Sequence, residues 1–305
     1  MNCRAIAGAI LGLVCLAAPA AAADPGLDQR IDAEQAVASG RKVLAGGHVD
    51  VGPRFVGGRW TLMIHDDAAK ADAGGRSVWR HPERTVLRVT DAALRQVPED
   101  PAYGFLGAAP GREVFVVPQT QNPEVVWVGW NTQDPRVMET IDRGVRLTLA
   151  GVEGPGALTV YLQSGDFAAP QVLWSSTGRA RPVWVDVNTH THANWVFSKP
   201  GVYLVRVRVT ADLVDGSTVT DTRALRFAVG SGTDVEEAFA ARPSADEPAA
   251  SPSASTTEDA AEDSGSSALI AALAVVAAAL AVAVAAVAVR GGRAKRRARA
   301  RARDA

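Results

Sequence analysis

The sequence predicts an all-β fold, an antiparallel immunoglobulin-like sandwich with a β-rich N-terminal companion, followed by one C-terminal transmembrane helix. Between residues 41 and 230, short runs rich in Val and aromatic residues alternate with Gly and Pro breaks, as in β-sandwiches. Residues 268–289 are all Ala, Val, Leu or Ile. A helix of that length measures about 33 Å, enough to cross the hydrocarbon core of a bilayer.

The first residues predict an export signal. A short apolar stretch follows Arg4, and small residues precede a cleavage point after Ala23. The apolar stretch is too short for a permanent span, which needs roughly 20 residues. We therefore expect a signal peptide at 1–23. Both cysteines, Cys3 and Cys15, fall within it, so the mature chain is expected to have neither a disulfide nor a thiol nucleophile.

The segments around the expected span predict its orientation. Residues 231–267 are rich in Ser, Pro, Ala and acidic residues, which predicts a disordered stalk. Residues 290–305 hold eight basic residues and one acidic residue, and such a cluster stays in the cytoplasm. We therefore expect a single-pass protein of the cell membrane, with residues 24–230 extracellular and the basic tail cytoplasmic.

Individual strands can be assigned from alternation of side chains. Val202–Val209 places valines on one face and Arg206 and Arg208 on the other, which is typical of a half-buried strand. The turn Asp215-Gly216 follows, and a partner run begins at Ser217. Further expected strands are 113–117, 125–130, 145–150, 158–163, 183–187 and 217–229.

The step Pro200-Gly201-Val202-Tyr203 resembles the corner of an immunoglobulin-like sandwich, in which a tyrosine near the start of a late strand fixes the corner. It places an immunoglobulin-like unit over residues 140–230. Residues 41–135 form the companion, either separate from this unit or continuous with it. A short helix is expected over 33–43.

No catalytic signature is present. The chain lacks a G-x-S-x-G elbow, a phosphate-binding glycine loop and an H-E-x-x-H motif, so we expect no enzymatic activity and no catalytic residue. The folded region is nearly neutral in charge, which does not favour a nucleic-acid partner.

Two pairs of potential ligands have the spacing of a strand. His190 and His192, and His48 and Asp50, are separated by two positions, so each pair lies on one face of an extended chain. Three imidazoles and a carboxylate suit Zn²⁺ or a related divalent ion such as Mn²⁺. The alternative is that these residues fix turns through hydrogen bonds to the backbone. No cofactor other than a metal is expected.

The run HTHANWVFSKPGVYLVRVRVTADLVDGSTVTDTRALRFAVG (190–230) resembles the actinobacterial surface-anchored protein domain. Upstream, GGHVDVGPRF (46–55), FLGAAPGREVFVVPQTQNP (105–123), VWVGWNT (126–132) and GPGALTVY (154–161) resemble the associated choice-of-anchor M domain. The resemblance implies a surface protein that accompanies metal-type ABC transporters, whose binding subunits belong to the zinc and manganese class. His48, Asp50, His190 and His192 fall on motif positions of the family.

Three functions compete at this point. The first is a non-enzymatic, surface-anchored binding module beside a zinc/manganese-type ABC transporter or its binding protein, able to bind a divalent metal. The second is a structural or adhesive surface protein that contacts cell-wall polymer or another protein. The third, an extracellular hydrolase, is disfavoured because no pair of nucleophile and base is visible.

Overall fold

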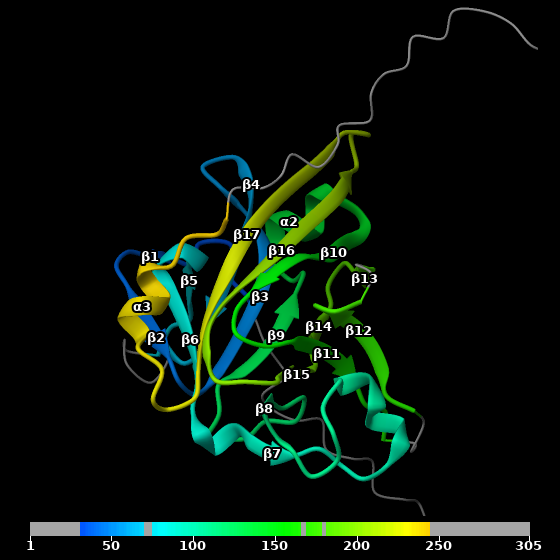
Figure 1. The fold of residues 1–305 in the computed structure, drawn as a ribbon. Helices are drawn as coiled ribbons and strands as arrows, with labels where there is room; N and C mark the ends of the chain where they lie inside the picture. Colours follow the sequence, from blue (N-terminus) through cyan, green and yellow to red (C-terminus); the bar gives the residue numbers. More distant parts are fainter. Residues whose placement is uncertain (1–30, 70–74, 166–168, 179–180, 245–305) are drawn as a thin grey trace, which may run out of the picture. The chain divides into compact units, whose positions relative to one another are not determined.

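The computed structural model of the protein describes residues 31–69, 75–165, 169–178 and 181–244, and these form three β-sheets with a few short helices (Figure 1). The expected all-β class is confirmed. The predicted signal peptide, the apolar segment 268–289 and the basic tail lie outside the described residues. Among the helices that are described, none has the length and apolar character needed to cross a membrane.

Each sheet combines strands from distant parts of the chain. Sheet A has the order β1 (Val37–Ala38), β5 (Val78–Arg80), β4 (Arg59–Asp66), β3 (His48–Val56), β9 (Trp127–Asn131) and β14 (His190–His192). Sheet B has the order β13 (Pro182–Asp186), β10 (Ile141–Glu153), β16 (Gly201–Leu213), β17 (Thr218–Val229), β6 (Thr85–Val89) and β2 (Lys42–Leu44). Sheet C has the order β12 (Gln171–Ser175), β11 (Leu158–Leu162), β15 (Asn194–Phe197), β8 (Glu113–Val117) and β7 (Leu94–Gln96).

The helices described from end to end are short. They are the 3₁₀ turns η1 (Pro82–Arg84), η2 (Asp91–Ala93) and η3 (Pro101–Leu106), and the α-helices α2 (Pro135–Thr140) and α3 (Val235–Ala240).

Sheets A and B are mixed while sheet C is antiparallel, so the purely antiparallel arrangement expected from the sequence is wrong in part. The pairs β1–β5, β3–β9, β2–β6 and β6–β17 are parallel. These partners are not joined by hairpins; the chain crosses between sheets before it returns alongside them. All three sheets draw strands from both 41–135 and 140–230, so the two ranges share one set of sheets.

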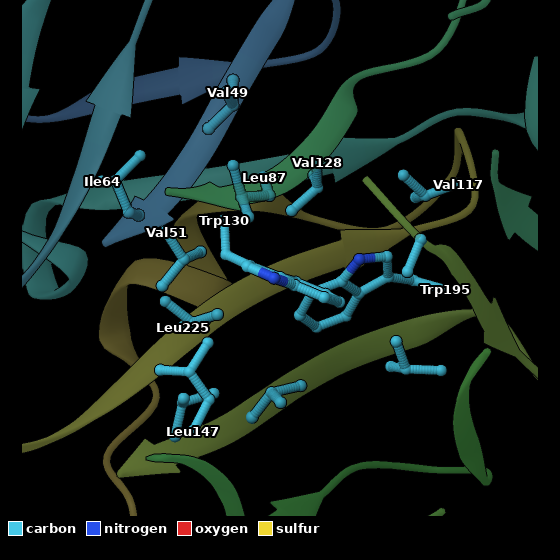
Figure 2. Close-up of a cluster of buried hydrophobic side chains, with 14 of the residues drawn as sticks. Val49, Val51, Ile64, Leu87, Val117, Val128, Trp130, Leu147, Trp195 and Leu225 are labelled. Atoms are coloured by element: carbon cyan, nitrogen blue, oxygen red, sulfur yellow. The ribbon is translucent and has the colours of Figure 1, made fainter. Parts of the chain in front are cut away.

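One hydrophobic core is shared by the three sheets. Figure 2 shows Trp130 of β9 and Trp195 of β15 within it, beside valines and leucines of neighbouring strands. The expected alternation in β16 is observed, because Val205, Val207 and Val209 are buried while Arg208 is exposed. In sheet A, Val49 and Val51 of β3 pack in the same core, so the alternate residues of that strand face the opposite side of the sheet.

Two local expectations are wrong. Residues 33–43 hold no helix; the guanidinium of Arg54 donates to the carbonyls of Ala33 and Gln35, and β1 pairs with β5, so this segment is held extended. Residues 231–244, expected in the disordered stalk, contain α3. Its N-terminus is capped by Asp234, and Ala238 is fully buried against sheet B, which fixes this segment to the fold.

Candidate metal centre

The four potential ligands of the sequence analysis come together on the face of sheet A that points away from the main core. His48 and Asp50 lie on β3, and His190 and His192 lie on β14. Strand β9 separates the two pairs. Asp50 and His192 are both paired with Gly129 of β9, so the three residues form one row across the strands.

The ligand atoms are close enough to share one small cation. The Nε2 atom of His48 lies 3.0 Å from that of His190 and 2.9 Å from that of His192, and the last two are 3.2 Å apart. Oxygens of the Asp50 carboxylate lie 3.4, 3.1 and 3.6 Å from the Nε2 atoms of His48, His190 and His192. All four ligand atoms fall within 4.8 Å of one another.

The absence of a side chain at Gly129 makes this convergence possible. A Cβ atom there would lie 2.6 Å from Oδ1 of Asp50, 2.6 Å from the carbonyl oxygen of Thr191 and 2.8 Å from Cε1 of His192. Real Cβ atoms essentially never approach other atoms under 3.0 Å. The glycine therefore leaves the space over β9 into which ligands from both sides project.

The centre is strongly coupled electrostatically. Burial lowers the pKa of His48, but hydrogen bonds and charge attraction from Asp50 and Asp67 outweigh it and raise that pKa to about 9. Burial raises the pKa of Asp50, yet contacts with His190 and His48 hold it well below its usual value. The pKa of His192 falls to about 3, because burial and the neighbouring imidazoles outweigh attraction by Asp50.

A second carboxylate orients one of the ligands. Nδ1 of His48 lies 2.8 Å from Oδ2 of Asp67, so that nitrogen carries the proton and Nε2 is directed to the centre. The hydroxyl of Ser77 donates to the other oxygen of Asp67. On the opposite side, Nδ2 of Asn131 donates to Oδ2 of Asp50 at 3.2 Å. The side chains of His48 and Asp50 are thus held by further hydrogen bonds, an arrangement that is usual around protein metal sites.

The centre is almost closed to solvent. The side chains of His48, Asp50, His190 and His192 are 9%, 0%, 4% and 2% exposed. The indole of Trp127 is stacked on the ring of His192, with ring centroids 3.7 Å apart. Water is therefore largely excluded, so the polar atoms of these side chains must find their hydrogen-bond partners within the protein.

The remaining histidines do not join the four. His65 is buried beside the centre, where its Nε2 contacts Oε1 of Gln35, and His81 lies apart near Glu83. Asn194 and Trp195 have the structural roles expected from the sequence. The Asn194 side chain accepts a hydrogen bond from the backbone of Gln119, and Trp195 is buried in the core.

Sequence reasoning missed the supporting residues Asp67, Ser77, Gly129 and Asn131. One signal could have found Asp67. The two-residue turn Gly57-Gly58, with φ of +56° and +80°, closes the β3–β4 hairpin and fixes its register, which brings His48 opposite Asp67.

Comparison with known proteins gives no further constraint. No protein family, curated protein or solved structure matches this chain. The resemblance to the actinobacterial surface-anchored proteins stays a prediction from the motifs.

Proposed function

We propose that this chain is a metal-binding module that holds one Zn²⁺ ion between β3 and β14. The observation that carries the proposal is the approach of three imidazole Nε2 atoms and a carboxylate to within 2.9–3.6 Å of one another. A neutral imidazole has a lone pair on one ring nitrogen, and here three Nε2 atoms converge beside a carboxylate in a buried place. A cation at the centre satisfies all four ligands together.

The dimensions favour zinc. The three Nε2 atoms lie 2.9, 3.0 and 3.2 Å apart, and Oδ2 of Asp50 lies 3.4 and 3.1 Å from two of them. A regular tetrahedron whose centre lies about 2.0 Å from each corner, the usual Zn–N distance, has an edge of about 3.3 Å. Ca²⁺ needs 6–8 oxygen ligands at roughly 2.3–2.6 Å. Mn²⁺ is the second candidate, but it prefers oxygen donors, whereas three of these four ligands are nitrogens.

The wider setting is proposed from the sequence. The apolar segment 268–289 with its basic tail supports an ectodomain anchored in the cell membrane, and the family motifs support a role beside a zinc/manganese-type ABC transporter. An immunoglobulin-like element is supported by the hydroxyl of Tyr203, which donates to the carbonyl of Lys199 at 2.7 Å, as in a tyrosine corner. With all four coordination positions supplied by protein, the site suits retention or sensing of an ion more than catalysis.

A second function, adhesion to cell-wall polymer or another protein, is favoured by one observation. Trp184 on the edge strand β13 is 44% exposed, and the guanidinium of Arg146 lies 5.7 Å from its ring. An exposed indole beside a charged group is a frequent contact in binding surfaces.

Calorimetric titration of the purified full-length chain with Zn²⁺ and with Mn²⁺ tests the proposal. We expect one saturable site with tighter binding of Zn²⁺, and loss of that site in the double variant His190→Ala/His192→Ala. The matched control is His81→Ala, since His81 lies outside the cluster. If neither ion gives saturable heat or a thermal shift, the metal proposal is wrong. Unchanged binding in the double variant would place the ligands elsewhere.

A further inference from the structure

The buried position of the ligands poses a problem of access. No ligand side chain is more than 9% exposed, so an ion cannot reach the Nε2 atoms while the surrounding strands stay in place. Some part of the protein must move for the ion to be taken up or released.

The two halves of the centre differ in how firmly they are held. Strand β3 lies inside sheet A, paired along its length with β4 and also with β9. Strand β14 has three residues, lies at the edge of the sheet and pairs only with β9. A strand with one hydrogen-bonded neighbour has fewer contacts to break, so it opens locally at a lower free energy than a strand paired on both sides.

The strand is tethered at both ends by other sheets. Along the chain, β13 at the edge of sheet B comes before β14, and β15 within sheet C follows it; the three strands are labelled in Figure 1. Displacement of β14 can therefore be local, since these flanking strands hold the chain on either side.

The turn before β14 is held by one buried threonine. The Thr132 hydroxyl accepts a hydrogen bond from the backbone N–H of Thr189 at 3.0 Å and donates to the carbonyl of Asp186 at 2.7 Å. Thr132 is 1% exposed and is not one of the four ligands. Its hydroxyl thus stabilises the closed position of the segment that carries His190 and His192.

We propose that β14 is the gate of the metal centre: the strand leaves β9 to admit or release the ion, and a bound ion locks it to β3. This inference rests on the proposed function and adds how that site is controlled. The two ligands on β3 form a fixed half-site, and the two on β14 complete the site when the strand closes. Binding of the metal then makes residues 187–193 at the edge of sheet A more ordered, and its release makes them less ordered.

The test measures kinetics and equilibrium in the full-length chain, with Zn²⁺ alone as the probe. Rapid mixing followed by tryptophan fluorescence gives the uptake rate, chelator challenge gives the release rate, and calorimetry gives the dissociation constant. We expect the uptake rate to reach a plateau at high Zn²⁺, set by opening of the strand. We expect hydrogen exchange in 187–193 to slow when Zn²⁺ binds.

The decisive variant is Thr132→Val, which keeps the side-chain volume and removes both hydrogen bonds. Uptake plateau and release should each rise about tenfold, with little change in the dissociation constant, because loss of two hydrogen bonds favours opening in both the free and the bound protein. The control Thr61→Val removes a buried hydroxyl that donates to the carbonyl of Arg59 in β4, and should leave both rates unchanged.

The gate is wrong if the uptake rate increases linearly with Zn²⁺ concentration, or if Thr132→Val and Thr61→Val have equal uptake and release rates. In either case, saturable Zn²⁺ binding would still support the proposed function. Absence of any saturable binding in the wild-type chain would overturn both.

Discussion

Substitution of Gly129 by alanine tests whether the ligands converge through the space over β9. The new Cβ would lie 2.6 Å from Oδ1 of Asp50 and from the carbonyl oxygen of Thr191, and 2.8 Å from Cε1 of His192. Ordinary contact begins at 3.4 Å. Neighbours on both sides of β9 must therefore move by several tenths of an ångström.

The structure sets the expected size of the effect. Asp50 is fully buried in an interior strand and the Thr191 oxygen belongs to the backbone, so neither can yield as an exposed flexible side chain does. Overpacking of this kind costs about 1–3 kcal/mol of unfolding free energy. Metal–ligand distances tolerate only about 0.2 Å, so displacement of the ligands should weaken Zn²⁺ binding by about 10- to 100-fold.

Competition titration with a chelator of known affinity measures the binding loss, and urea unfolding measures the change in stability. Gly104→Ala is the matched control, because a Cβ at Gly104 meets no atom within 4 Å. We expect the control to change stability by less than about 0.5 kcal/mol and Zn²⁺ affinity not at all.

One result would refute the geometry. If Gly129→Ala binds Zn²⁺ as tightly as wild type, with the ion still dependent on His190 and His192, the ligands do not meet over Gly129.

Three further predictions follow from the same structure. The pKa of His48 is raised from 6.5 to about 9, so the protonated imidazole stabilises the metal-free fold fully below pH 6.5. Unfolding measurements should show this contribution, roughly 3 kcal/mol, being lost as pH rises through 9. Zn²⁺ affinity should instead rise about tenfold per pH unit from 6 to 8, because the proton that the ion displaces becomes easier to remove. A metal-free stability that stays constant between pH 7 and 10 would contradict this assignment. Asp67→Asn should weaken Zn²⁺ binding about 10- to 100-fold in the same competition titration. The control Asp66→Asn removes a buried carboxylate paired with Arg80 and should leave the Zn²⁺ affinity unchanged. If the two variants bind Zn²⁺ equally tightly, Asp67 does not orient His48. Trp195→Ala should cost about 3–5 kcal/mol in urea unfolding, since the ring is 1% exposed, against less than about 1 kcal/mol for the exposed Trp184→Ala; similar losses would contradict the burial described here.

Two strands were predicted closely. Glu113–Val117 matches β8 residue for residue, because a short run of Val and Phe favours a strand even where both faces are packed. The run from Val202 to Val209 lies inside β16, where the alternation of valines with Arg206 and Arg208 indicates a half-buried strand. The hairpin of β3 and β4 was missed, because both strands are buried on both faces: Leu62-Met63-Ile64 is a continuous apolar run, and the polar residues that alternate in His48–Val51 are themselves buried.

The candidate site was half predictable. The i, i+2 spacing correctly placed each ligand pair on one face, since that is a local property of an extended chain. The meeting of the two pairs could not be derived, because β3 and β9 are parallel neighbours without a connecting turn to fix their register. The role of Gly129 could not be predicted for the same reason, because it depends on the position of this glycine between Asp50 and His192 in the sheet.

The sequence separation of the ligands has a consequence for the unfolded chain. Asp50 and His190 are 140 positions apart, and the chain has no cysteine beyond residue 15 with which to form a covalent link. An ion held by both joins two parts of the fold that are distant in sequence. Because the ion binds the folded chain and is released on unfolding, its stabilisation grows with the concentration of free metal, to about 2.7 kcal/mol at a hundredfold excess over the dissociation constant. Zinc here would act as a reversible cross-link that thiol reductants do not affect and a chelator removes. The free energy of unfolding of the domain would therefore depend on the concentration of free metal around it.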